Sequence, residues 1–158
     1  MSELSPNAKK VIEDHLDRYP SKQAVTLPAL HVVQQETGCV SRKAITEIAD
    51  ILELSPAQIN DTLSFYGFFR TEEDPLGKKR VWICRSLPCM LRGGEELLAE
   101  LCSRWNIQPG QTTADGEVTL ELAECLGACD GAPCMLVDDE LTLCVTADEV
   151  EKQVRGGV

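Results

Sequence analysis

Apolar residues recur at helical spacing through the first part of the chain, to about Phe69. Four short helices are predicted there, because a capping or terminating signal lies beside each apolar run. In chain order these signals are Ser5-Pro6 before the first helix, Gly38 after the second, Ser41 before the third and the stretch SPAQ (55–58) before the fourth. The inward-facing positions are Ile45, Ile48, Ala49 and Leu52 on the third helix and Ile59, Leu63 and Tyr66 on the fourth. Such short helices need one another's apolar faces, so residues 1–69 are predicted to form a helical domain.

The pattern changes after a polar stretch at 70–80, which contains Pro75 and Gly77 and is predicted to be a linker. Residues 81–158 alternate between strand and helix patterns. The predicted elements are a strand ending at RVWIC (80–84), a helix over 93–105, a strand over 117–125, a hairpin from 134–139 and 141–145, and a helix from the capping box TADE (146–149) to about Val154. This β-α-β-β-α order is typical of a thioredoxin-like α/β domain, so the fold class is α+β, with a four-helix domain first.

Charge and composition narrow the range of partners. The 158-residue chain has a formal net charge of −11, which disfavours nucleic acid and anionic membrane surfaces as partners. The chain shows neither a secretory signal nor an apolar run long enough to span a bilayer, so we expect a cytoplasmic protein without direct membrane insertion. Cytoplasmic thiols stay reduced, and the eight cysteines therefore suggest metal binding rather than a disulfide framework.

Two close cysteine pairs follow predicted strands. Cys84 and Cys89 form a Cys-x4-Cys pair, and Cys125 and Cys129 form a Cys-x3-Cys pair. If the two strands are parallel neighbours, both loops leave the same edge of the sheet and the four thiols converge. Four thiolates repel one another unless cations neutralise them. A [2Fe–2S] cluster takes two thiolates per iron and fits two separate pairs, whereas structural zinc favours Cys-x2-Cys knuckles. Zinc binding and metal-free redox thiols remain alternatives at this point.

The other cysteines and the histidines are assigned no ligand role. Packing is the favoured interpretation for Cys39, Cys102 and Cys144, the last of these as a core residue of a strand. Cys134 is also interpreted as a packing residue, with substitution for a lost ligand as the alternative. His15 and His31 belong to the helical domain, which argues against histidine ligation of a cluster.

Four stretches resemble the family of the 24-kilodalton subunit of NADH dehydrogenase, over about residues 10–152. They are LHVVQQETGCVSRKAITEIADILELSPAQI (30–59), FYGFF (65–69), CRSLPCMLRGGEELL (84–98) and GQTTADGEVTLELAECLGACDGAP (110–133). That family includes the corresponding subunit of bacterial complex I and equivalent subunits of NAD-linked hydrogenases and formate dehydrogenases. The resemblance implies one [2Fe–2S] cluster on Cys84, Cys89, Cys125 and Cys129.

The resemblance also implies a function that the chain does not perform alone. No nucleotide or flavin fingerprint is present, so NADH and FMN are expected only in a partner subunit, beside other iron–sulfur subunits. We expect an electron-transfer subunit of NADH-quinone oxidoreductase, held peripherally at the inner face of the membrane through its complex. The different-class alternative is a zinc-binding adaptor. A carboxylate about 10 Å from the cluster makes its one-electron reduction less favourable by ~1.7 kcal/mol, which lowers the reduction potential by roughly 70 mV. The acidic residues near the cysteine motifs therefore favour a cluster of low potential.

Overall fold

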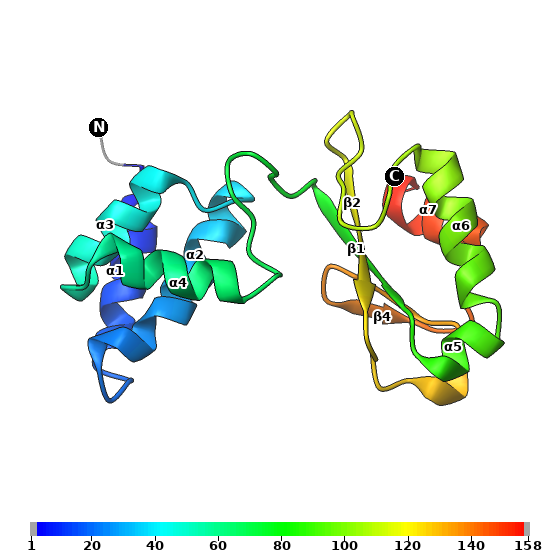
Figure 1. The fold of residues 1–158 in the computed structure, drawn as a ribbon, viewed down its shortest axis with the longest axis horizontal. Helices are drawn as coiled ribbons and strands as arrows, with labels where there is room; N and C mark the ends of the chain where they lie inside the picture. The colour runs from blue at the N-terminus through cyan, green and yellow to red at the C-terminus, as the bar shows by residue number, and fades with distance from the viewer. Residues whose placement is uncertain (1–2, 157–158) are drawn as a thin grey trace. The chain divides into compact units, whose positions relative to one another are not determined.

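The computed structural model describes residues 3–156 and divides the chain into two compact units. The first unit ends at Pro75 and the second begins at Leu76, within the segment 70–80 that was expected to be a linker. Each unit has an apolar core of its own. Figure 1 shows the helices and strands of each unit. Within residues 3–156, no helix is both long and apolar enough to cross a membrane.

The first unit is built from helices. They are α1 (Pro6–Leu16), the 3-10 turn η1 (Lys22–Val25), α2 (Thr26–Thr37), α3 (Arg42–Leu52) and α4 (Pro56–Phe65). Ser5 and Ser41 accept hydrogen bonds from the first turns of α1 and α3, and Ser55 forms both bonds of a capping box with Gln58. Gly38 ends α2 in the left-handed conformation, with φ of 77°. The four predicted helices and their caps are therefore confirmed.

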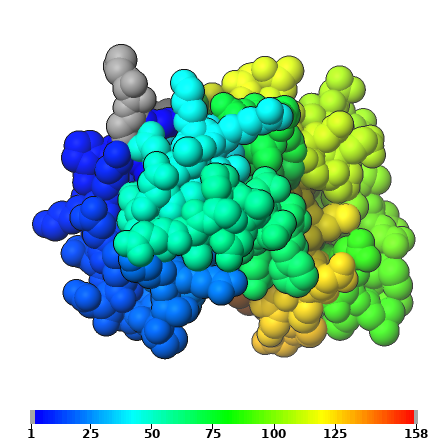
Figure 2. Space-filling view, turned by 60° about the vertical axis from the view of Figure 1, so that its left-hand side comes forward, coloured from blue at the N-terminus to red at the C-terminus, as the bar shows by residue number. Residues whose placement is uncertain are grey.

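The core of this unit lies between the predicted apolar faces. The buried positions include Ile45, Ile48, Ala49 and Leu52 on α3 and Ile59 and Leu63 on α4. Figure 2 shows the outer surface of the segment that carries these two helices, coloured cyan to green-cyan. The prediction for Tyr66 is wrong: its side chain is 36% exposed. Because α4 ends at Phe65, Tyr66 has an extended backbone and leaves the helical face that it would otherwise have continued.

The second unit contains a four-stranded sheet. Its elements are β1 (Lys79–Cys84), α5 (Leu87–Leu91), α6 (Gly94–Trp105), β2 (Val118–Ala123), the 3-10 turn η2 (Cys129–Gly131), β3 (Met135–Val137), β4 (Glu140–Thr142) and α7 (Ala147–Arg155). The strand order is β2-β1-β3-β4, with β1 parallel to β2 and antiparallel to β3. The β3–β4 hairpin and the Thr146 capping box are confirmed, whereas α5 was not predicted.

The two faces of the sheet differ in character. Figure 1 shows α6 and α7 together on one face, and the apolar side chains of alternate strand positions pack against them, among them Val81, Ile83, Leu120 and Met135. The opposite face carries an ion pair between Arg80 on β1 and Glu121 on β2, beside the ring of Trp82. The apolar face fixes the sheet on its helices, and the ion pair joins the two strands that lead to the cysteine loops.

Candidate metal centre

The parallel pairing of β1 and β2 brings the two cysteine motifs to one edge of the sheet. Cys84 is the last residue of β1 and lies in register with Ala123, the last residue of β2. Cys125 follows two residues later, so both loops leave the sheet at its carboxyl edge. The strands are neighbours and parallel, as the convergence argument required.

The short helix α5 carries the second thiol of the first motif. Cys84 and Cys89 are 2% and 1% exposed, so both lie inside the protein. The chain turns from α5 into α6 at Gly94, where a Cβ atom would lie 2.8 Å from the carbonyl oxygen of Cys89. Only glycine allows the first turn of α6 to approach the Cys89 main chain this closely.

The second motif lies on the solvent side. Cys125 and Cys129 are both exposed; we call them the exposed thiol pair. Gly127 adopts φ of 76°, and its N–H donates to the Cys125 sulfur at 3.4 Å. This bond is of the kind expected for a loop that holds sulfur ligands, because a main-chain N–H stabilises negative charge on the thiolate.

A third buried thiol lies beside the first motif. The sulfur atoms of Cys89 and Cys134 are 3.7 Å apart, and those of Cys84, Cys89 and Cys134 all lie within 4.8 Å of one another. We call these three residues the buried thiol group. The favoured interpretation of Cys134 as a packing residue was incomplete, because its side chain packs directly against two predicted ligands. The spacing of the motifs gives no sign of this, since the contact depends on the pairing of β3 with β1.

The ionisation of these thiols depends strongly on their surroundings. Burial raises the pKa of Cys134 to about 12, reinforced by the neighbouring Cys89 thiol. Burial also raises the pKa of Cys89. For Cys84 burial is outweighed by hydrogen bonds from the main-chain N–H groups of Ser86 and Leu126, which lower its pKa. Partial desolvation by the surrounding loop, and then the nearby Cys125, raise the pKa of the exposed Cys129 thiol.

The donor set fits a cluster of metal ions. Thiols that are buried and crowded lose their protons together only when cations compensate the charge. The two motifs offer four sulfur donors at one edge of the sheet, two buried and two exposed. Such a set is suited to a thiophilic centre such as [2Fe–2S]. Cys84, Cys89, Cys125 and Cys129 remain the predicted ligands.

The remaining cysteines lie outside this site. Cys102 is half-buried on α6 and packs against the core of the second unit. The prediction for Cys144 is wrong: it is exposed and belongs to no strand, because β4 ends at Thr142 and Cys144 adopts φ of 52°. His15 and His31 lie on α1 and α2 of the helical unit.

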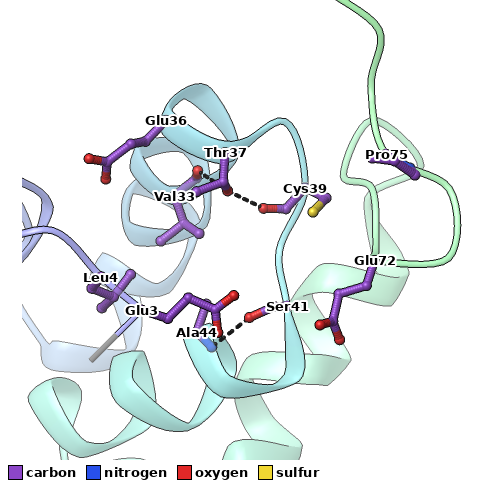
Figure 3. Close-up of a pocket in the computed structure, with 10 residues that line it drawn as sticks. All are labelled: Glu3, Leu4, Val33, Glu36, Thr37, Cys39, Ser41, Ala44, Glu72 and Pro75. Atoms are coloured by element: carbon purple, nitrogen blue, oxygen red, sulfur yellow. Dashed lines mark hydrogen bonds between the residues drawn. The ribbon is translucent and has the colours of Figure 1, made fainter. Parts of the chain in front are cut away.

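Cys39 lines a small acidic cavity within the helical unit (Figure 3). The cavity measures about 290 Å³, and its wall includes Glu3, Glu36 and Glu72. Burial and the carboxylates of Glu72 and Glu3 raise the pKa of the Cys39 thiol, which therefore stays protonated. The single protonated thiol gives no indication of a metal site there.

A thioredoxin-like sheet with cysteine loops at the end of its parallel strands defines a class of metal-binding redox proteins. The chain belongs to the thioredoxin-like [2Fe-2S] ferredoxin family, whose model matches residues 12–156. Family membership confirms the fold expected from the sequence and supports one [2Fe–2S] cluster as the cofactor.

Named relatives share most of the chain. One NADH-quinone oxidoreductase subunit of Rhizobium meliloti is 38% identical over 132 residues, which cover 84% of this chain and 77% of the relative. The NADH-quinone oxidoreductase subunit 2 of Thermus thermophilus is 35% identical over 148 residues, which cover 92% of this chain and 81% of the relative. A crystal structure of an NAD+-reducing [NiFe]-hydrogenase in the H2-reduced state matches with a TM-score of 0.71 and 27% identity. The match covers 84% of this chain and only 23% of the hydrogenase chain.

Proposed function

We propose that this chain is an electron-transfer subunit of NADH-quinone oxidoreductase. It carries one [2Fe–2S] cluster on Cys84, Cys89, Cys125 and Cys129 and exchanges single electrons with the flavin of a partner subunit that oxidises NADH. The observation that supports the proposal is that both cysteine motifs begin at or just beyond the carboxyl ends of two adjacent parallel strands. Among the described residues, the sulfurs that lie within 4.8 Å of one another are those of Cys84, Cys89 and Cys134, so the exposed thiol pair has to approach them when the cluster binds. The names of the relatives from Rhizobium meliloti and Thermus thermophilus support the choice of complex.

The residues of the site have distinct tasks in this proposal. The main chains of Cys84 and Cys89 are fixed by the end of β1 and by the approach of Gly94, so this side of the site is rigid and closed to water. The exposed thiol pair faces solvent, where a partner can approach it. When bound, a [2Fe–2S] cluster accepts and returns one electron at a time, whereas a hydride delivers two to the flavin.

Apolar side chains next to the first motif offer a contact surface. Leu87 and Leu91 on α5 are 61% and 74% exposed, and Met90 between them is 38% exposed. Exposed apolar residues grouped around a site are typical of protein contacts. We propose that the flavin-binding subunit covers this part of α5, and that other iron–sulfur subunits and the inner face of the membrane are reached through the complex.

The carboxylates beside the ligands favour a low reduction potential. Glu124 and Asp130 are exposed and adjoin Cys125 and Cys129 in the chain. The charge of Asp130 opposes the negative charge that reduction adds, whereas that of Glu124 is partly offset by its ion pair with Arg85 at 3.3 Å. The net charge of −11 acts in the same direction as Asp130. A strongly positive midpoint in a redox titration would contradict this part of the proposal.

An equivalent subunit of an NAD+-reducing hydrogenase is the second candidate, because the hydrogenase structure matches both in fold and over most of this chain. A formate dehydrogenase subunit is a third host of the same kind. The alternative of another class is a zinc-binding adaptor. In that case the purified protein would be colourless and would contain one zinc ion per chain instead of iron and sulfide.

Reduction by NADH tests the proposed function. The chain is purified anaerobically alone and together with an NADH-oxidising flavoprotein that co-purifies with it, and NADH is added to each sample. We expect the visible absorption to bleach only when the flavoprotein is present, because this chain has no recognisable nucleotide fingerprint. Equal bleaching without a partner, or none with it, would exclude the proposed role.

A further inference from the structure

The site contains more buried sulfur than the two motifs require. Cys134 is 1% exposed and belongs to a small cluster that includes Cys84, Cys89 and Ala132. Apart from the four predicted ligands, the chain's remaining thiols differ from it in position. Cys39 belongs to the helical unit, Cys102 packs on α6 and Cys144 is exposed.

The sheet holds Cys134 opposite Cys84. In the antiparallel pairing of β1 with β3, Ile83 lies opposite Met135, so the next pair in register is Cys84 with Cys134. The N–H of Cys84 donates to the carbonyl oxygen of Cys134 at 3.2 Å. Directly opposed residues in antiparallel strands have their Cα atoms about 4.5–5.5 Å apart, which keeps both thiols at the same edge.

The sulfur separations match those of ligands on one metal ion. Two thiolates bound at about 2.3 Å to one tetrahedral ion lie about 3.8 Å apart. The Cys89 and Cys134 sulfurs are 3.7 Å apart, and all three sulfurs of the buried thiol group lie within 4.8 Å of one another. Cys134 therefore lies where it can serve the metal ion that Cys84 and Cys89 bind, with little movement of the chain.

We propose that Cys134 is a reserve ligand that takes the place of Cys89 beside Cys84 when the Cys89 thiol is lost. This inference rests on the proposed function, since it assumes that the two motifs hold a [2Fe–2S] cluster. It assigns Cys134 to the buried side of the site only. The exposed thiol pair has no such reserve, because the close sulfur contacts of Cys134 are with Cys84 and Cys89.

The test compares loss of a buried ligand with loss of an exposed one, each with and without Cys134. The full-length variants are C89A, C89A/C134A, C129A, C129A/C134A and C134A, reconstituted anaerobically beside the unaltered chain. Iron and acid-labile sulfide per chain, visible absorption and the electron spin resonance of the reduced protein are measured. C89A/C144A is the matched control, because Cys144 is an exposed thiol in the loop that precedes α7. C89A/C134S tests whether any loss of cluster in C89A/C134A comes from lost packing at position 134, because serine nearly keeps the size of cysteine but lacks its sulfur.

We expect C89A and C89A/C144A to keep cluster content within about twofold of the unaltered chain, with altered spin resonance, because the reserve thiol restores four sulfur ligands. The cluster content of C89A/C134A should fall at least about tenfold, because losing even an outer-shell partner of a metal ligand costs about 10–100-fold in metal affinity. C89A/C134S should also lose the all-thiolate spectrum. C129A and C129A/C134A should be equally depleted, and C134A should be fully loaded.

Four results would overturn the inference. One is loss of the cluster in C89A, and another is its retention in C89A/C134A. The third is depletion of C134A, which would make Cys134 a primary ligand. Rescue of C129A by Cys134 would likewise contradict the assignment to the buried side. A failure of the proposed function is distinguishable, because the unaltered chain would then contain no iron or sulfide.

Discussion

The ion pair between Arg80 and Glu121 offers a direct test of how the two ligand-bearing strands are held together. The Glu121 side chain is 7% exposed and that of Arg80 is 16% exposed, and the guanidinium lies 4.4 Å from the centre of the Trp82 ring. Glu121→Gln leaves the guanidinium largely buried without its countercharge. Breaking a buried pair in this way costs about 3–5 kcal/mol, and the partial exposure of Arg80 places the expected loss near the lower end, at about 3 kcal/mol.

Thermal unfolding followed by circular dichroism measures this loss. For a unit of this size about 3 kcal/mol lowers the midpoint by on the order of 15 °C. Glu117→Gln is the matched control, because Glu117 pairs with Lys78 at 2.5 Å just before the same two strands, but both side chains are well exposed. We expect no resolvable shift for the control, since water screens exposed pairs. Equal midpoints for the two variants would refute the reasoning.

Replacing both Arg80 and Glu121 measures what the ion pair as a whole contributes to the free energy of unfolding. The single variant measures in addition the cost of leaving the guanidinium unpaired. In Arg80→Met with Glu121→Leu, apolar side chains of similar volume fill the space, so most of the lost stability should return. If the double variant is no more stable than Glu121→Gln, the loss comes from disturbed packing and not from the unpaired guanidinium.

Three further predictions concern single positions. Gly94→Ala places a Cβ 2.8 Å from the carbonyl oxygen of Cys89. We expect denaturation to show that the second unit is destabilised by about 1–3 kcal/mol, and metal analysis to show less iron bound per chain. The hydroxyl of Thr113 donates to the Asp115 carboxylate and lowers the pKa of Asp115. The carboxylate's contribution to stability is therefore present above the ordinary aspartate pKa and is lost as pH falls through the lowered value. Asp115→Asn should flatten the loss of stability as the pH falls below about 4. Thr146→Ala removes a capping box and should cost about 1 kcal/mol in urea unfolding. These predictions would be contradicted by unchanged iron content in Gly94→Ala, by an unchanged loss of stability in acid in Asp115→Asn, or by an unchanged urea midpoint in Thr146→Ala.

Local signals were sufficient to predict most of the helices. Ser55 and Thr146 open capping boxes that involve only residues three positions away, so sequence alone identifies them. The failure at Tyr66 arose at a helix end, where one residue with an extended backbone redirects the side chain. The short helix α5 was missed because its five residues are too few for a periodic pattern.

The candidate site was predictable only in part, because it depends on pairing between distant strands. The strand patterns placed both cysteine loops at strand ends, but the shared edge follows from the parallel pairing of β1 and β2, which the sequence argument had to assume. The position of Cys134 depends on the antiparallel pairing of β3 with β1, which no local pattern specifies. Cys144 was misplaced because the chain leaves β4 early, and its N–H donates to the carbonyl of Gly131 at 2.7 Å instead of continuing the strand.

The central claim is that two cysteine loops hold one pair of bridged iron ions, and metal analysis combined with spin resonance tests it most directly. Protein purified anaerobically should contain two irons and two sulfides per chain and give a rhombic signal after dithionite reduction. The signal should disappear in Cys125→Ala, because the exposed side of the site then lacks one sulfur. A colourless protein with one zinc per chain, or a signal that is unchanged in Cys125→Ala, would contradict the account.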